Sequence, residues 1–286
     1  MLVVDLSRYA PGPFATRELL GLGARVVCVE PPEGDPLRVV DPAWHGALNE
    51  GKESVVCDLR ADPALAQALC ARADVVVDGF RPGVAQRLGL DGGERTVWCA
   101  ITGFGSGGPH EQRVGHDLNY LGFAGVLERG GHPPVPVADY AGAFAAVREI
   151  LAALLERERS GHGSRIEISM TGEAARLYAP PILTGAAACY RVYETGDGGR
   201  LTVAALEPRF WDRFCELVGL PGLPALAPAL PELEARLRER PLVEWLELFE
   251  GEEVCTGPVA EREPLRGRAP TLGEHTEAWR GELSAR

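Results

Sequence analysis

A histidine and two aspartates are the residues of this chain whose types and spacing best suit chemistry. His116 and Asp117 stand where the pattern predicts the start of a helix, and Asp139 follows a proline-rich turn and opens a second helical run. Small and apolar residues recur at helical spacing behind the first pair: Leu118, Leu121, Gly122 and Gly125. Two titratable groups at helix entrances suit proton transfer, but an aspartate at a helix start is also a common cap. Position alone favours capping for both aspartates.

Composition limits the classes of partner. Of the 286 residues, 45% are hydrophobic and 24% charged, which is the balance of ordinary globular proteins. The formal net charge of −12 argues against nucleic acid or an anionic membrane as the main partner. A local basic pocket for an anionic ligand is still compatible with that charge. Lys52 is the only lysine, so Schiff-base chemistry has a single candidate.

The cysteines and the other histidines form no metal-binding pattern. The seven cysteines include no CxxC pair, and several stand inside apolar runs such as 26–29 and 97–100, as buried reduced thiols do. Four histidines lie in polar or Pro/Gly-rich stretches without partners at metal-ligand spacing: His45, His110, His132 and His275. No apolar run reaches membrane-spanning length, and the first residues do not read as a secretory signal. We therefore expect a soluble, cytoplasmic protein without a metal.

The first part of the chain alternates short apolar runs with helical segments. Strands are predicted at 2–6, 25–30, 55–58, 74–78, 96–101 and 165–169. Helices are predicted among them at 14–20, 63–71, 84–88 and 141–158. This alternation predicts an α/β fold in which a Rossmann-like, doubly wound sheet carries helices on both faces.

A different pattern begins at Tyr190. The segments 190–195 and 201–205 read as a β-hairpin around a glycine-rich turn, and helical segments follow at 208–217, 232–238 and 242–249. These features predict a smaller α+β domain. We expect a large α/β domain at 1–180, a small α+β domain at 181–260, and a C-terminal segment at 261–286 that returns to the large domain.

Three loops are candidates for ligand binding because they follow strands of the predicted sheet, where such folds bind ligands. The loops 31–38 and 80–83 carry Arg38 and Arg81 beside glycine or proline. The loop 102–109 is rich in glycine, which lets a backbone approach a ligand. It formally contains GxGxxG, but Pro109 follows and no helix does, so we reject a dinucleotide site. The glycines and prolines of each loop are also what an ordinary turn requires, so no single loop by itself indicates a ligand site.

A series of ordered motifs extends over nearly the whole chain. It comprises VDLSR at 4–8, PGPFAT at 11–16, the runs 27–38 and 49–59, FRPG at 80–83, TGFG at 102–105, GHD at 115–117, AD at 138–139 and LEP at 206–208. This series resembles the family III coenzyme A transferases and, within them, the α-methylacyl-CoA racemases.

The resemblance implies a fold, a partner and a ligand site. Two chains of this family interlock as a homodimer, and each site lies between the large domain of one and the small domain of the other. The ligand is an acyl-CoA, with no cofactor beyond the coenzyme A of the substrate. Arg38 and Arg81 are expected near its phosphates, and 103–105 near the pantetheine or thioester. The full set expected to bind coenzyme A is Arg38, Asp58, Leu59, Arg81, Gly103, Phe104, Gly105, Gly115, Asp117 and Tyr120.

The reaction has two principal alternatives. In the racemases, residues matching His116 and Asp139 take and return the α-proton of a 2-methylacyl-CoA, and an acid matching Glu207 orients the histidine. In the transferases, the acid matching Asp139 is a nucleophile that forms a mixed anhydride, and an aromatic residue usually replaces the histidine. The resemblance favours the racemase, because His116 and Glu207 are both present.

Two departures from the family pattern leave a third alternative open. Racemases usually have three glycines soon after the acid, where this chain has Ala143 and Phe144, so we expect these side chains to crowd the acyl pocket. The chain is also short for the family after Thr171. A coenzyme A-binding relative without catalytic activity is therefore the third hypothesis.

Overall fold

The computed structural model of the chain describes residues 1–128, 131–177 and 179–285. It divides into two compact units, one formed by Met1–Leu177 with Pro264–Arg286 and the other by Tyr178–Glu263. Each unit has its own core of buried apolar side chains. No helix in the described part of the chain has the length and apolar character needed to cross a bilayer.

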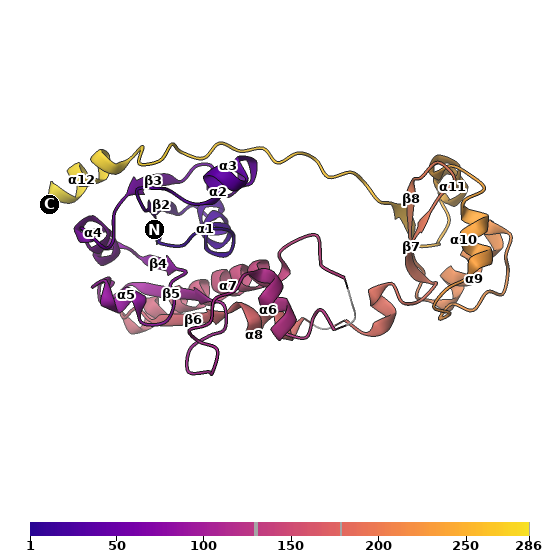
Figure 1. Ribbon diagram of the computed structural model, residues 1–286, viewed down its shortest axis with the longest axis horizontal. Helices are drawn as coiled ribbons and strands as arrows, with labels where there is room; N and C mark the ends of the chain where they lie inside the picture. The colour runs from indigo at the N-terminus through magenta and orange to yellow at the C-terminus, as the bar shows by residue number, and fades with distance from the viewer. Residues whose placement is uncertain (129–130, 178, 286) are drawn as a thin grey trace. The chain divides into compact units, whose positions relative to one another are not determined.

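The first unit is built on a sheet of parallel strands (Figure 1). The strands are β1 (Leu2–Asp5), β2 (Arg25–Glu30), β3 (Glu53–Val56), β4 (Val75–Asp78), β5 (Val97–Thr102) and β6 (Arg165–Ser169). Their order across the sheet is β3-β2-β1-β4-β5-β6, and every pairing is parallel. This is the Rossmann order, in which the chain reverses direction across the sheet between β1 and β4. The predicted fold class is confirmed for this unit.

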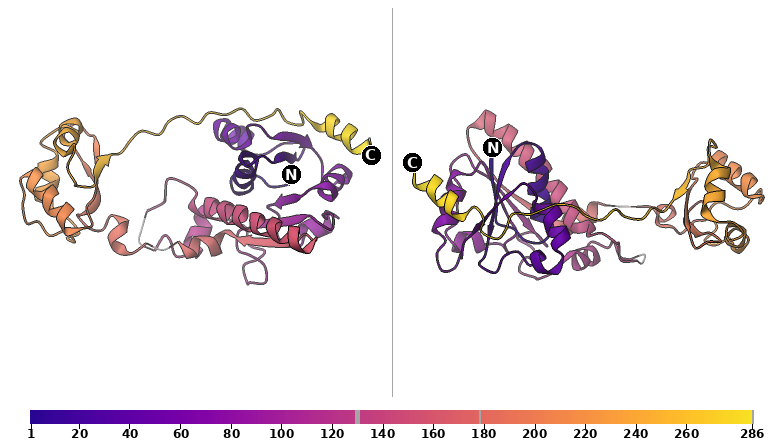
Figure 2. Two further views of the ribbon diagram at one scale, coloured as in Figure 1. Left: turned by 180° about the vertical axis from the view of Figure 1, so that it is seen from behind. Right: turned by 90° about the horizontal axis from the view of Figure 1, so that it is seen from above.

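Helices cover both faces of the sheet, because successive strand residues point to opposite sides. Val75 and Val77 of β4 join one buried cluster, whereas Val76 joins the other. The first cluster lies under α1 (Pro11–Gly21), α6 (Asp117–Phe123), α7 (Val137–Ser160) and α8 (Met170–Arg176). The second includes residues of α4 (Ala64–Arg72), α5 (Val84–Arg87) and α12 (Thr276–Ser284). Figure 2 shows the long α7 running along the sheet beside β6.

Several helices differ from those predicted. The short helices α2 (Leu37–Val40) and α3 (Pro42–Asn49), together with α12, were not expected. The start of α3 has a recognisable local signal, since Asp41 accepts a hydrogen bond from the Trp44 N–H at 3.0 Å and proline follows it. Helix α7 begins at Val137 rather than at 141.

The second unit is a small α+β structure, as predicted. Its antiparallel sheet joins β7 (Tyr190–Glu194), β8 (Arg200–Ala204) and β9 (Thr256–Pro258). A short 3-10 helix, η1 (Pro181–Thr184), precedes the sheet, and three helices pack with it: α9 (Pro208–Val218), α10 (Pro231–Leu237) and α11 (Leu242–Phe249). Trp211, Phe214 and Trp245 supply the largest side chains of its core.

The C-terminal segment packs closely on the first unit. The His275 N–H donates to the Ser54 carbonyl of β3 at 2.9 Å, and Trp279 of α12 is buried. Farther back along the segment, a Cβ added to Gly46 of α3 would lie 2.4 Å from the Gly267 carbonyl oxygen. Backbone contact this close explains why a residue without a side chain stands at position 46.

Lys52 is a structural residue rather than a reactive amine. Its side chain is fully buried, with Nζ 3.8 Å from Asp5 Oδ2. The ammonium donates to the Pro13 carbonyl at 2.7 Å, to Thr16 Oγ1 at 2.9 Å and to Asn49 Oδ1 at 3.0 Å. These contacts join α1, α3 and the end of β1, and they leave the only lysine no role as a Schiff base.

Replacing Lys52 with methionine is expected to lower the free energy of unfolding by about 3–5 kcal/mol, because Asp5 then keeps a buried charge without its partner. Arg95→Met is the matched control, since it removes an ion pair with Glu158 whose side chains are 53% and 67% exposed. The control should change stability by less than ~1 kcal/mol. Urea denaturation followed by circular dichroism measures both, and equal effects would contradict the assigned role of Lys52.

Candidate functional site

A cavity of about 530 Å³ opens beyond the carboxyl ends of β1 and β4, where the strand order reverses. The cavity is lined by residues 6–9, 11 and 12, which follow β1, and by residues 79–81, which follow β4. His116 and Asp139 both line this central cavity, so the structure brings together the two residues predicted to act on a proton. Ligands of doubly wound sheets bind at this reversal point.

The backbone at His116 begins α6. The residue is extended, with φ −126° and ψ 177°, and its N–H donates to the Asn119 side-chain oxygen at 3.1 Å. Asn119 thus satisfies a backbone donor at the helix start, as in a capping box. The arrangement leaves the imidazole exposed on the cavity side of the helix start.

Asp117 caps a helix, but not the one that its position in the sequence suggested. Its Oδ1 accepts from the N–H groups of Ala138 and Asp139, at 2.7 and 3.1 Å, in the first turn of α7. These donors have no partner within their own helix, and their capture explains why α7 begins earlier than predicted. Asp117 is 8% exposed and does not line the central cavity. The structure therefore gives Asp117 a supporting place at the start of α7, and its contact with coenzyme A stays a prediction.

Asp139 titrates near neutrality. Burial of its carboxyl and the nearby charge of Asp117 raise the pKa of Asp139 to about 7. A carboxyl with this pKa is present both with and without its proton at neutral pH, as a group that accepts and returns a proton requires. Asp117 Oδ2 is itself buried and finds no hydrogen-bond partner within the described residues.

The Tyr120 ring explains why glycine stands at two of the positions that were predicted to contact coenzyme A. A Cβ on Gly103 would lie 2.5 Å from the Tyr120 ring, and one on Gly115 would lie 2.9 Å from it. The Tyr120 hydroxyl also donates to the Gly115 carbonyl. All three residues line cavity surface, but the glycines are first of all required by the packing of this ring.

Two further cavities adjoin the central one along the same edge. The second, about 500 Å³, shares Arg81, Gly115, His116 and Tyr120 with it and adds Gly103, Glu111 and Arg113. The third, about 430 Å³, shares Leu6, Arg8 and Phe80 with the central cavity and includes Asp58 and Leu59. Arg8, Tyr9 and Arg113 were not singled out from the sequence. The first two directly follow a predicted strand, and this position was a usable signal.

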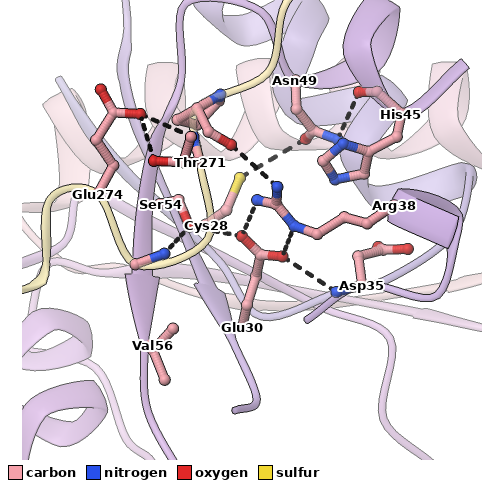
Figure 3. A network of polar contacts seen from close by, with 12 residues as sticks. Cys28, Glu30, Asp35, Arg38, His45, Asn49, Ser54, Val56, Thr271 and Glu274 are labelled. Carbon is pink, nitrogen blue, oxygen red and sulfur yellow. Dashed lines mark hydrogen bonds and ion pairs between the residues drawn. The ribbon is translucent and has the colours of Figure 1, made fainter. Parts of the chain in front are cut away.

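Arg38 does not line any of these three cavities. Figure 3 shows its side chain directed at Glu30. Its guanidinium makes two hydrogen bonds of 2.7 Å to the carboxylate of Glu30, and it donates to the Pro270 carbonyl at 3.0 Å. The bidentate pairing raises the pKa of Arg38 and, against the effect of burial, lowers the pKa of Glu30. In the structure Arg38 thus holds the C-terminal segment, and its contact with a phosphate of coenzyme A stays a prediction.

Other predicted residues also lie outside the central cavity. Phe104 packs edge-on against Tyr120 and Phe123, with ring centroids 5.3 and 5.1 Å apart, and Gly105 has a left-handed backbone with φ 76°. Neither lines the central or second cavity. Glu207 belongs to the second unit, where it is exposed at the start of α9.

Ala143 and Phe144, which were expected to crowd the acyl pocket, do not line the central cavity. Ala143 is fully buried in the core of the first unit. Phe144 is 56% exposed and packs against Phe14, with ring centroids 5.2 Å apart. Neither residue lines the cavity that contains Asp139, because the helix turns them away from it.

Comparison with known proteins identifies the family. Residues 1–274 match the sequence profile of CoA-transferase family III. The chain belongs to this family. Alpha-methylacyl-CoA racemase from Homo sapiens is 34% identical over 298 residues, which cover 90% of this chain and 76% of the relative. Acetyl-CoA:oxalate CoA-transferase from Acetobacter aceti is 28% identical over 313 residues, which cover 91% and 80%.

The fold supports the same assignment. A CAIB/BAIF family protein from Brucella suis superposes with a TM-score of 0.84 at 26% identity, covering 99% of this chain and 98% of its own. The predicted resemblance is confirmed, and the chain is an enzyme of family III, similar both to racemases and to CoA-transferases.

The raised pKa of Asp139 predicts a pH-dependent loss of stability in this family III enzyme. The folded-state pKa of about 7 lies above the unfolded value of about 3.9, so the native state binds the proton more tightly. The resulting stability is fully present below the unfolded pKa and is lost as pH rises through 7. Between pH 5 and pH 8, wild type should therefore lose ~2–3 kcal/mol of unfolding free energy relative to Asp139→Asn.

Urea denaturation of both proteins at the two pH values measures this difference. Asp117→Asn provides the control, because it keeps an oxygen to cap α7 but removes the charge that helps to raise the pKa of Asp139. In that background the pH-dependent gap should shrink. A gap of the same size at pH 5 and pH 8 in the wild-type background would contradict the raised pKa.

Proposed function

We propose that this enzyme is an acyl-CoA racemase or epimerase. It interconverts the stereoisomers of a 2-methylacyl-CoA by removing the α-proton and returning it through an enolate. The observation that carries the proposal is that His116 and Asp139 line one cavity, with the pKa of Asp139 raised to about 7. Two bases at one cavity supply a proton acceptor and a proton donor for the two faces of a single carbon.

The chemistry favours proton transfer over nucleophilic attack by Asp139. The α-proton of a thioester is weakly acidic, so its removal needs a base that works near neutral pH and donors that stabilise the enolate oxygen. A carboxyl with a pKa of about 7 suits this task. The unprotonated form of the same carboxyl would also be the nucleophile of a transferase, and it is His116 at the same cavity that favours proton transfer.

The adjoining cavities have room and charge for the coenzyme A portion of the substrate. The third cavity, with Asp58, Leu59 and Arg8, would receive the nucleotide. Arg81, which is exposed at the central cavity, would meet a phosphate, because guanidinium groups bind phosphate well. The pantetheine arm would then lead the thioester to His116 and Asp139. No cofactor other than the coenzyme A of the substrate takes part.

The proposal includes a homodimer. The second unit contains Glu207, exposed at the start of a helix, and in this assembly it would orient the His116 imidazole of the other subunit. A carboxylate beside the imidazole stabilises the protonated form that follows removal of the α-proton.

Deuterium wash-in at the α-carbon of 2-methylacyl-CoA esters in D₂O tests the reaction. The wild-type protein should exchange the α-proton, and His116→Gln and Asp139→Asn should each lower the rate by about 10²–10⁴-fold, because each removes one acid–base group. Arg95→Met serves as a surface control with wild-type exchange. Absence of exchange by the intact protein across a panel of acyl groups would overturn the proposal.

A CoA-transferase is the alternative. It is favoured by the similarity to the Acetobacter aceti enzyme and by the carboxyl of Asp139 at the cavity. It predicts a covalent adduct at Asp139 during turnover with an acyl-CoA and a second carboxylic acid. Trapping with hydroxylamine, followed by mass spectrometry of the peptide that contains Asp139, should find no modified peptide if the racemase proposal is right. A trapped adduct together with absent α-proton exchange would favour the transferase.

A further inference from the structure

Tyr9 has a backbone conformation that tyrosine rarely adopts. Its φ is 64°, and it is one of two non-glycine residues with positive φ among those that the structure describes. This left-handed region is unfavourable for residues with bulky side chains. Strained residues of this kind persist only where the surroundings hold them, and they cluster at functional sites.

A buried carboxylate holds Tyr9 in place. Asp35, which is 6% exposed, accepts the Tyr9 N–H at 2.9 Å through Oδ2 and the Leu37 N–H at 2.7 Å through Oδ1. The N–H of Asp35 in turn donates to Glu30 Oε2 at 3.1 Å. Burial raises the pKa of Asp35, whereas its hydrogen bonds from the Leu37 and Tyr9 N–H groups act in the opposite direction and favour the carboxylate.

Further hydrogen bonds support Asp35 from behind (Figure 3). Glu30 accepts two hydrogen bonds from Arg38 and a third from the Ser54 hydroxyl at 2.6 Å. Both Glu30 oxygens are thus occupied, and the ion pair ties the segment after β2 back to that strand. This network extends by hydrogen bonds as far as the backbone of Tyr9.

The side chain of Tyr9 meets the imidazole of His116. The two rings pack edge to face, with centroids 5.4 Å apart and an interplanar angle of 78°. Both residues line the central cavity. The Tyr9 ring thus lies against one side of the imidazole, and the Asn119 side-chain oxygen accepts from the N–H of the backbone from which the imidazole projects.

We propose that Tyr9 is a positioning residue for His116, held in a strained backbone conformation so that its ring fixes the direction of the imidazole. The inference rests on the proposed function, in which His116 exchanges a proton with the α-carbon. Proton transfer requires hydrogen-bond reach, and a misplacement of about 1 Å can lower a rate by about 10²-fold. Tyr9 itself takes and gives no proton.

Three variants of the full-length protein separate the ring from the backbone. Tyr9→Phe keeps the ring, Tyr9→Leu removes it, and Tyr9→Gly removes it while relieving the positive φ. In the deuterium wash-in assay, Tyr9→Phe should stay within about 3-fold of wild type. Tyr9→Leu and Tyr9→Gly should lose about 10–100-fold in kcat, with KM within about 3-fold. The thermal midpoint of Tyr9→Gly should equal or exceed that of wild type. If Tyr9 had only a structural role, the loss of activity would instead come with a lower thermal midpoint.

A second readout does not depend on catalysis. The chain has six histidines, few enough for the imidazole resonances to be assigned by NMR, with His116→Gln identifying the one in question. Loss of the neighbouring ring in Tyr9→Leu should shift the His116 Cε1–H resonance, whereas Tyr9→Phe should preserve it and His162 should not change in either. An unmoved His116 resonance in Tyr9→Leu overturns the positioning role. Wild type without α-proton exchange overturns the proposed function alone.

Discussion

One carboxylate oxygen places the two titratable groups His116 and Asp139 at the central cavity. Asp117 Oδ1 caps the first turn of α7 while its neighbour His116 begins α6. Two helix starts are thereby joined through a single side chain, and Asp139, in the first turn of α7, comes to line the same cavity as His116.

The same contact also sets the chemistry of Asp139. A cap acts best when charged, so Asp117 brings a negative charge close to the second carboxyl. Burial, together with this charge, raises the pKa of Asp139 to about 7. Asp117 therefore contributes both to the position of Asp139 and to its proton affinity, and the cavity beyond β1 and β4 gains a group that can change its protonation state at neutral pH.

Arg38 shows where residue type misleads. An arginine in a loop that follows a strand is a reasonable phosphate ligand, and Arg81 meets that description at the cavity. Arg38 also follows a strand in the sequence, but Glu30 lies within hydrogen-bond reach and forms an ion pair with its guanidinium. An ion pair between residues eight positions apart, on a strand and in the loop that follows it, is decided by how the loop folds back. The strain at Tyr9 and its contact with His116 likewise leave no mark in the local sequence.

The sequence by itself determined the fold class and the residue types of the chemistry. Short apolar runs alternating with helical segments are a local property, because burial on both faces of a parallel sheet requires them. The same holds for the hairpin of the second unit and for His116 at the start of a helix. Tertiary structure alone decided that Asp117 caps α7 and not its own helix, that Arg38 is occupied, and that Ala143 and Phe144 avoid the cavity. Those outcomes depend on which distant atoms come within hydrogen-bond or contact distance, and periodicity carries no information about that.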